Sequence, residues 1–289
     1  MGTAILSGVL QACKAHKATG NIPQFTKFLA TVHSESSENA LKARFANDED
    51  QDWISISRDN LDAVKEADVI ILAFKPYMID AVLSADAATY QKLFKDKLII
   101  SVLVGSPTSK IENAVFGDQF GEKERKTLYV KRAMPNIGAR YAQSMTVIET
   151  NPSPPFTALP AFEALTEFIF STIGPVKHVL PSTYDISGVL AGASGAFLSV
   201  ALDGILDGAV SQGLKRGDAR EILTGSLKSL TRLLEEGEHP AMLREMFSSP
   251  KGTTIRGLLT LEEEGVRWGF ARATERASER SIEIGEVKR

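Results

Sequence analysis

The stretch "SSPKGTT" at residues 248–254 combines hydroxyl side chains, a lysine, and the proline and glycine that commonly shape a turn. A helix is expected to begin near Thr253, because the apolar residues that follow recur at helical spacing. The free N–H groups at a helix start carry a partial positive charge, so this turn is suited to a carboxylate or a phosphate. The alternative is an ordinary helix start that serine and threonine side chains cap.

A second stretch of this kind opens the chain, where Gly2 and Thr3 begin a helix with an apolar stripe in "MGTAILSGVL". In dinucleotide-binding folds a glycine-rich turn joins the first strand to such a helix, and the pyrophosphate lies on the helix N–H groups. Met1-Gly2 is similar to the tail of the fingerprint G-x-G-x-M-G. We therefore expect a Rossmann-type unit whose first strand is missing. The alternative is a complete protein whose N-terminal helix merely packs on the sheet.

The order of the predicted elements supplies a scaffold for both stretches. Short apolar runs alternate with helical patterns at "FLATVHS" (28–34), "WISIS" (53–57), "DVIILAF" (68–74), "KLIISVLVG" (97–105) and "TLYVKRAMP" (127–135). This alternation predicts an α/β fold with a mostly parallel sheet wound on both sides. From about residue 182 the pattern predicts helices only, one of them opened by a capping box of Asp218 and Glu221. The predicted domains are a nucleotide-binding domain over residues 1–180 and an all-α domain over residues 181–289.

Composition excludes several classes of function. A net charge of −3 gives no electrostatic case for nucleic acid. The single cysteine, Cys13, excludes an internal disulfide framework, and the four dispersed histidines predict no metal site. No signal peptide is recognised, so we expect a cytoplasmic protein. The Gly- and Ala-rich run at residues 186–202 is short for a membrane span and is followed by Asp203, so we expect a buried helix there.

Five motifs, in order along nearly the whole chain, resemble those of the pyrroline-5-carboxylate reductase family. They are "MGTAILSGVL" (1–10), "ADVIILAFKP" (67–76), "RAMPN" (132–136), "LAGASGAFLSVALDG" (190–204) and "HPAMLREMFSSPKGTTIRGLLTLE" (239–262). The last is the most specific, because it is similar to the family signature P-x-x-L-x-x-x-V-x-S-P-G-G-T-T-I-x-x-L-x-x-L-E. The chain departs from the family at Ile137-Gly138, Gly195, Phe247 and Lys251, which stand in place of Thr-Pro, Pro, a smaller aliphatic residue and Gly.

The resemblance implies an imine reductase that transfers hydride from NADPH to the C=N bond of 1-pyrroline-5-carboxylate or a ring-substituted analogue. The product would be L-proline or a proline derivative. A protonated imine accepts hydride readily, so the site needs orientation and charge complementarity more than a strong acid. Thr254 resembles the family threonine that contacts the substrate ring nitrogen and is the predicted catalytic residue. The implied substrate-binding residues are Ser249, Lys251, Gly252, Thr253 and Thr254.

The cofactor residues follow from the resemblance and from the ends of the predicted strands. The serine-rich segment "VHSESSEN" (32–39) favours NADPH, because hydroxyls accept a 2′-phosphate whereas an acidic side chain prefers a free 2′-hydroxyl. NADH is the alternative. The predicted cofactor-binding residues are Gly2, Thr3, Ser34, Asn60, Ala73, Lys75, Pro76, Val104, Gly105 and Asn136.

The helix expected at residues 186–210 is apolar around most of its circumference. A small helical domain on its own does not bury that much apolar surface. The family's homodimer through the C-terminal helices would bury it, and a central helix of a monomer is the alternative. A related dehydrogenase of 3-hydroxy acids would need a catalytic lysine in this helix, which has none. The remaining alternative is a non-catalytic or truncated paralogue that lacks competent dinucleotide binding.

Overall fold

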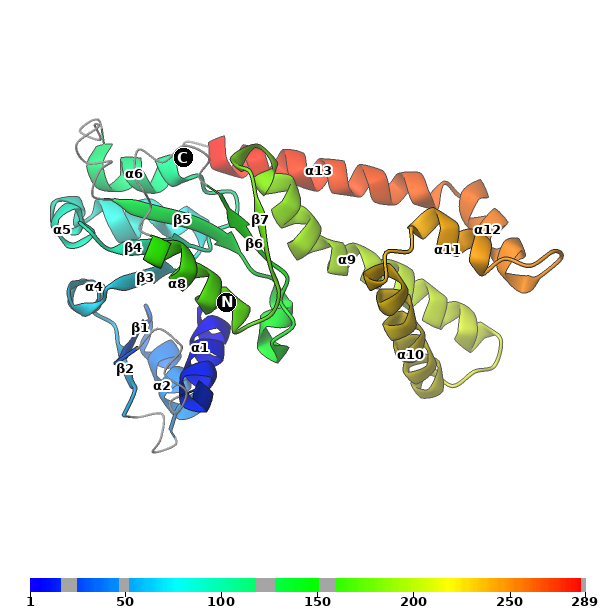
Figure 1. Ribbon diagram of the computed structural model, residues 1–289, viewed down its shortest axis with the longest axis horizontal. Coiled ribbons are helices and arrows are strands. Elements are labelled where there is room, and N and C mark those ends of the chain that lie inside the picture. The colour runs from blue at the N-terminus through cyan, green and yellow to red at the C-terminus, as the bar shows by residue number, and fades with distance from the viewer. Residues whose placement is uncertain (17–24, 47–51, 118–127, 151–159, 287–289) are drawn as a thin grey trace. The chain divides into compact units, whose positions relative to one another are not determined.

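The computed structural model describes residues 1–16, 25–46, 52–117, 128–150 and 160–286 (Figure 1). The chain divides into two compact units. Unit 1 is Met1–Gly192 together with Arg280–Arg289, and unit 2 is Ala193–Glu279. Two long helices, α9 (Pro181–Ser211) and α13 (Val266–Glu286), contribute to both units. The predicted boundary near residue 180 coincides with the start of α9, whereas the compact units meet inside that helix.

Unit 1 contains two sheets. In the first, β1 pairs in parallel with β2, with Ala30 opposite Ile56. In the second, of order β3-β4-β5-β6-β7, the first three strands are parallel and β6 runs antiparallel to β5. The mostly parallel sheet that the sequence predicts is therefore confirmed. The strands are β1 (Phe28–Thr31), β2 (Ile54–Ser57), β3 (Val69–Leu72), β4 (Leu98–Ser101), β5 (Tyr129–Met134), β6 (Thr146–Glu149) and β7 (Val176–Val179).

Helices cover both faces of the larger sheet, because its strands carry apolar side chains on both sides. Ile99 of β4 points into a cluster with α5 and α6, whereas its neighbours Leu98 and Ile100 point into a second cluster with α1 and α8. The helical elements of this unit are α1 (Gly2–His16), α2 (Glu35–Arg44), α4 (Asn60–Glu66), η1 (Pro76–Met78), η2 (Asp80–Ser84), α5 (Ala87–Leu93), α6 (Thr108–Phe116), η4 (Ile137–Tyr141) and α8 (Pro160–Ser171).

The two sheets are separate among the described residues, and the break falls between β1 and β3. In a doubly wound sheet of order 3-2-1-4 the first strand takes this place, ahead of the helix that here is α1. No strand precedes α1 in the described part of the chain. Side chains hold β1 beside the rest of the unit: Phe25 stacks on Phe168 at 6.0 Å between ring centroids, and Lys27 pairs with Glu66 at 2.8 Å.

Unit 2 is entirely helical. Besides its parts of α9 and α13 it contains α10 (Arg216–Glu235), α11 (Pro240–Met246) and α12 (Thr253–Glu263). The start of α12 at Thr253 confirms the sequence prediction. The predicted capping box at Asp218 and Glu221 is wrong, because α10 begins at Arg216 and its N-cap residue Lys215 makes no side-chain cap. Asp218 therefore lies inside the first turn of α10 and not at its N-cap.

Candidate functional site

The start of α1 lies against the carboxyl end of β3. A Cβ atom added to Gly2 would come within 3.1 Å of the Cβ of Ala73, the first residue after β3, so this approach favours glycine. The carbonyl of Met1 accepts the first helical hydrogen bonds, from Ala4 at 2.8 Å and from Ile5 at 3.2 Å. The N–H groups of Gly2 and Thr3 precede the first bond of the ladder and are suited to a phosphate oxygen.

A cavity of about 720 Å³ lies beyond β1 and β2. It is lined by His33 after β1, by Arg58 and Asn60 after β2, and by residues of η1 and η2 that follow β3. The carboxyl ends of these strands therefore meet at one edge, the place where parallel α/β sheets bind nucleotides. Of the predicted cofactor residues, Asn60 lines this cavity.

The charged side chains that line this cavity are Arg58, Glu38, Asp59 and Asp86, and the first two belong to a small network on its wall. Arg58 Nε lies 3.3 Å from Glu38 Oε2, and Glu38 also pairs with Lys42 at 2.6 Å. The hydrogen bond from Lys42 lowers the pKa of the Glu38 carboxyl, so Glu38 is ionised and holds both cations. Ser34 is exposed and serves as the N-cap of α2, accepting from the Ser37 N–H at 3.2 Å. Its hydroxyl oxygen is thus already used by the helix.

The remaining predicted cofactor residues follow β3 and β4. Lys75 is exposed and is the N-cap of η1, and Pro76 is the first residue of η1. Val104 is 48% exposed after β4, and the next residue, Gly105, is buried with φ 62°. A Cβ on Gly105 would meet the Ser281 carbonyl oxygen at 2.8 Å, so this glycine serves the close approach of α13. Of these two residues, Val104 is exposed and Gly105 is not.

Asn136 stands at the end of β5 with its side chain fully engaged. Its Oδ1 accepts from the Gly138 N–H at 2.9 Å and caps η4, and its Nδ2 donates to the Ala191 carbonyl at 3.0 Å. Its own N–H donates to Ser144 Oγ at 2.9 Å. Asn136 therefore fixes η4 and the first part of α9 to the end of β5, and this positioning role was not visible in the sequence.

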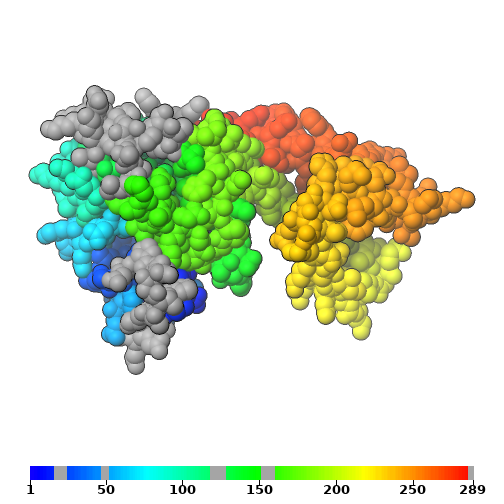
Figure 2. Space-filling view, in the orientation of Figure 1, coloured from blue at the N-terminus to red at the C-terminus, as the bar shows by residue number. Residues whose placement is uncertain are grey.

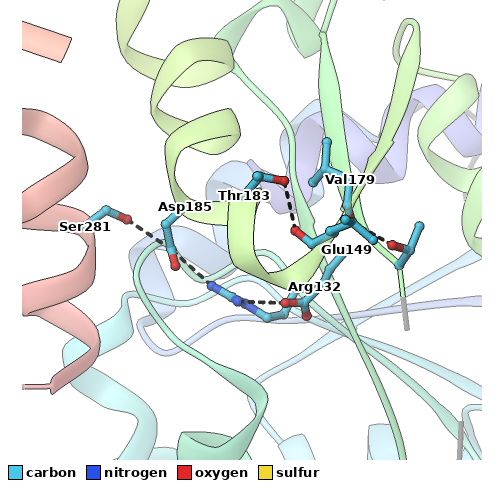
Figure 3. Close-up of polar contacts among 8 residues, drawn as sticks. Arg132, Glu149, Val179, Thr183, Asp185 and Ser281 are labelled. Carbon is cyan, nitrogen blue, oxygen red and sulfur yellow. Dashed lines mark hydrogen bonds and ion pairs between the residues drawn. The ribbon is translucent and has the colours of Figure 1, made fainter. Parts of the chain in front are cut away.

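Arg132, four residues earlier on β5, forms a buried cluster with two carboxylates (Figure 3). Its guanidinium lies 3.1 Å from Glu149 Oε1 of β6 and 3.2 Å from Asp185 Oδ1 of α9. It also lies over the ring of Tyr184 at 4.0 Å from the centroid. Ser281 of α13 donates to Asp185 at 3.3 Å. The cluster therefore joins two strands of the sheet to the ends of both long helices.

Burial governs the ionisation of this cluster. It raises the pKa of the Glu149 carboxyl, and the nearby Arg132 offsets that rise only in part because its charge is shared with Asp185. Burial also raises the pKa of the Tyr184 hydroxyl, which stays protonated. Burial is the largest effect on Glu149, so its carboxyl keeps a proton to higher pH than an exposed glutamate does.

The turn between α11 and α12 in unit 2 holds the predicted substrate residues. Lys251 adopts φ 61°, the left-handed region that favours glycine, which explains why the family signature has Gly there. Gly252 is the N-cap of α12 without a side-chain cap, and a Cβ on it would lie 2.4 Å from Ser249 Oγ. No acidic residue stands in the first turn of α12. The exposed side chains here are Ser249, Lys251, Thr253 and Thr254.

This helix start has the features of an anion site. The N–H groups of the first turn of an 11-residue helix project past Gly252, and the neighbouring side chains offer hydroxyls and one ammonium group. The capping alternative requires a serine or threonine side chain on these N–H groups, and Gly252 at the N-cap provides none. The structure gathers Ser249–Thr254 in one turn of unit 2, and the predicted cofactor residues belong to unit 1.

The residues of unit 1 fit a dinucleotide at two places. The N–H groups at the start of α1, where Gly2 allows a close approach to Ala73, suit a phosphate. The cavity beyond β1 and β2 offers Arg58, His33 and Asn60 to a ribose and its phosphate. Sequence reasoning missed Arg58 as a site residue, although its position directly after the strand "ISIS" would have indicated it. Among described residues no group of histidine, cysteine and acidic side chains could hold a metal ion.

Two family models match the chain. Residues 181–284 match "pyrroline-5-carboxylate reductase dimerisation", and residues 1–105 match "NADP oxidoreductase coenzyme F420-dependent". The two regions correspond to the helical part of the chain and to the strands that carry the nucleotide-type edge.

Full-length relatives give the same pattern. The chain is 36% identical to a pyrroline-5-carboxylate reductase of Lophium arboricola, over 99% of this chain and 91% of that protein. It is also 36% identical to a pyrroline-5-carboxylate reductase of Neurospora crassa, over 96% and 88%. Its fold is similar to the crystal structure of Plasmodium falciparum pyrroline carboxylate reductase with NADP bound, with TM-score 0.76 and 20% identity over 99% and 94% of the chains.

Proposed function

Because this chain belongs to the pyrroline-5-carboxylate reductase family, we infer that it reduces 1-pyrroline-5-carboxylate to proline with NAD(P)H as hydride donor. The observation that carries this conclusion is the 36% identity across 91% of a curated reductase. The uncapped start of α12, with its hydroxyls and Lys251, supplies the carboxylate site that such a substrate needs. A non-catalytic paralogue would not need this turn kept free of acidic side chains.

Different residues of the chain bind the substrate and orient it for this reaction. When bound, the nicotinamide supplies the hydride to the imine carbon. The N–H groups at the start of α12 bind the substrate carboxylate, and Lys251 adds a positive charge. The Thr254 hydroxyl orients the ring nitrogen and holds a proton at it, so that the developing amine is neutralised. Gly252 keeps the helix start open to the carboxylate.

The test is a kinetic comparison on the purified full chain. Thr254→Val is expected to lower kcat by about a hundredfold with little change in Tm, because it removes only the hydroxyl at the reacting nitrogen. Thr254→Ser keeps the hydroxyl and should retain most activity. Thr260→Val, which changes another exposed threonine on the same helix, is the matched control. Wild-type protein that fails to oxidise NADPH in the presence of the imine would refute the reductase.

We propose that NADPH is preferred to NADH through the cavity beyond β1 and β2. Arg58 faces this cavity and would pair with a 2′-phosphate in place of Glu38. Arg58→Ala should raise KM for NADPH at least tenfold and leave KM for NADH unchanged. Glu38→Gln frees Arg58 and should lower KM for NADPH. Equal effects on both cofactors would contradict the assignment of Arg58.

We propose that the chain is a homodimer through its helical part. Gly192, Gly195 and Gly204 on α9 have nothing within 4 Å of an added Cβ in the described chain, so this helix offers a backbone surface for close packing. By length and composition α9 could also cross a membrane, and only 6% of its most apolar window is buried within the chain. A second copy covers the same surface, and the matched dimerisation model spans this helix.

We propose a cytoplasmic location, because the single cysteine, Cys13, can form no internal disulfide and suits a reducing compartment. Fractionation of expressing cells is expected to place the protein in the soluble fraction at high salt. Recovery only with detergent would favour the membrane alternative for α9.

A further inference from the structure

The end of α13 returns to unit 1 after the whole of unit 2 in sequence. Arg280–Arg289 belongs to unit 1, whereas the earlier part of the same helix belongs to unit 2. Ser281, Ile284 and Gly285 are spaced three and four residues apart, so they share one face of the helix. Ser281 is buried and the other two are half-buried. This face of α13 is therefore packed against the nucleotide-type domain.

The element that it covers is the turn between β4 and α6. A hydrogen bond from the Ser106 N–H to the Leu103 carbonyl, at 3.3 Å, closes this turn around Val104 and Gly105. Val104 is exposed, whereas a Cβ atom added to Gly105 would lie 2.8 Å from the Ser281 carbonyl oxygen. One central residue of the turn is thus open to a ligand, and the next one is covered by α13.

The contact between the turn and α13 is made by two glycines. A Cβ atom added to Gly285 would lie 2.9 Å from the Gly105 carbonyl oxygen and 3.3 Å from Pro107 Cδ. The carbonyl is a backbone group and cannot rotate away as a flexible side chain does. Gly105 also adopts φ 62°, which favours glycine. A side chain at position 285 would therefore displace the turn from the helix.

A second contact holds this end of α13 in place. Ser281 Oγ donates to Asp185 at 3.3 Å, and Asp185 pairs with Arg132 of β5 (Figure 3). Arg132 lies opposite Ser101, the last residue of β4, in the parallel register of the two strands. The helix end is thus tied to the strand beside β4, and it can support the turn that follows β4.

We propose that Gly285 is a positioning residue for the dinucleotide. It allows α13 to pack on the backbone of Gly105 and so holds the turn, with Val104 exposed, in the conformation that binds the cofactor. A displaced turn would have to be moved back on binding, and that cost appears as weaker affinity. This inference rests on the proposed binding of NAD(P)H to the residues that follow β4.

The experiment measures the Kd of NADPH for the purified full chain by calorimetry, in the absence of the imine. Gly285→Ala is expected to raise this Kd at least tenfold, because it displaces the preformed turn. The KM for NADPH should rise in parallel, with kcat at saturating NADPH and the KM for the imine unchanged. Gly269→Ala is the matched control in the same helix, since an added Cβ there meets nothing within 4 Å in the described chain.

Two further variants test the same contact. Gly105→Ala combined with Gly285→Ala should raise the Kd by less than the product of the two single effects, because both displace one turn. If Gly285→Ala does not fold, Ile284→Ala decides, since its side chain packs on Gly105 without a new clash. It is expected to raise the Kd by about threefold through loss of support for the turn.

A merely structural role of Gly285 would lower Tm and the fraction of active protein while the Kd of the folded protein stayed unchanged. That result would overturn the proposal, as would independent effects of the two glycines or an equal rise in Kd for Gly269→Ala. Wild type that binds NADPH but does not reduce the imine would refute the reductase alone, because the Kd values still decide the role of Gly285. Wild type that binds no NADPH would overturn both.

Discussion

Units 1 and 2 differ in how they use apolar residues. In unit 1, β4 is completely buried between two clusters, and Leu98, Ile99 and Ile100 are each 0% exposed. In unit 2, all of which is described, the buried apolar residues are Ala219 and Leu243. Many of its other large apolar side chains are exposed, and the rest are half-buried. Figure 2 shows the surface of α10, α11 and α12 in yellow to orange.

Unit 1 therefore has a core of its own, whereas the exposed apolar side chains of unit 2 support the proposed homodimer. Monomeric proteins rarely expose large contiguous apolar patches, and an interface core resembles a protein interior cut in half. The exposed set in unit 2 comprises Leu198, Val200, Ile205, Val210, Leu214, Ile222, Leu230, Leu234, Met242, Met246, Phe247, Leu259, Leu261 and Trp268.

The largest effect is expected from charging the exposed face of α9. Leu198→Glu with Ile205→Glu should raise the Kd of the dimer by at least a hundredfold. Each side chain contributes roughly 1.5–3 kcal/mol when buried, and a symmetric interface repeats the change. Analytical ultracentrifugation measures the shift. Gln212→Glu, which adds a charge beyond the end of α9, is the control. Unchanged association in the double variant would mean that α9 is not the interface.

Removing the central cation of the Arg132 cluster is expected to have the next largest effect, and it acts on unit 1 alone. Arg132→Met leaves two carboxylates without their partner and should lower the free energy of unfolding by about 3–5 kcal/mol. Urea denaturation measures the loss. Arg132→Lys keeps the positive charge but cannot contact Glu149 and Asp185 at once, so it should lower the free energy of unfolding by less. A loss under about 1 kcal/mol for Arg132→Met would show that the cluster is not a structural anchor.

A smaller and opposite effect is expected in unit 2. Lys251→Gly should raise the free energy of unfolding by about 0.5–1 kcal/mol, because glycine adopts φ 61° without the clash of a Cβ atom. The same change should raise KM for the imine by removing a cation near the carboxylate. Thermal unfolding and steady-state kinetics on one preparation separate the two. A fall in Tm would contradict backbone strain at Lys251. An unchanged KM would contradict a role of the Lys251 charge in binding the substrate carboxylate.

The smallest effect concerns the pH dependence of unit 1. The folded-state pKa of Glu149 is raised above its ordinary value of 4.5, so the native state binds a proton that the unfolded state releases. Stability from this group is complete below pH 4.5 and is lost as pH rises through the raised pKa. Wild type should therefore lose stability relative to Glu149→Gln over this window, as measured by urea unfolding at several pH values. If wild type instead gained stability relative to Glu149→Gln as pH rises, folding would lower the pKa of Glu149 and not raise it.

Much of the fold was predictable because its signals are local. The apolar runs at 68–74 and 97–105 contain the strands β3 and β4, as the sequence pattern predicts. The misplaced capping box at Asp218 shows the limit of this approach. A helix start depends on the dihedral angles of the preceding turn, and the side-chain pattern alone does not determine them.

The geometry of the candidate site was predictable where it is a single turn and less so where distant segments meet. Residues 248–254 carry their own geometry, so the turn and the start of α12 follow from the sequence. Gly105 looked like a cofactor residue because it follows a strand, yet its neighbour is Ser281 on a helix far away in sequence. The sequence did not indicate a role for Arg132 or Arg58, because only the fold brings their partners Asp185 and Glu38 next to them.

The break between β1 and β3 has a consequence for the energetics of cofactor capture. The β1–β2 sheet shares no ladder with the larger sheet among the described residues, so it should open as a separate cooperative unit with a lower free energy than the β4 core. Amide hydrogen exchange would then be fast in Ile54–Ser57 and slow in Leu98–Ser101. A nucleotide that binds in the cavity beyond β1 and β2 stabilises the folded form of this sheet. Protection of its amides from hydrogen exchange should therefore rise with cofactor concentration.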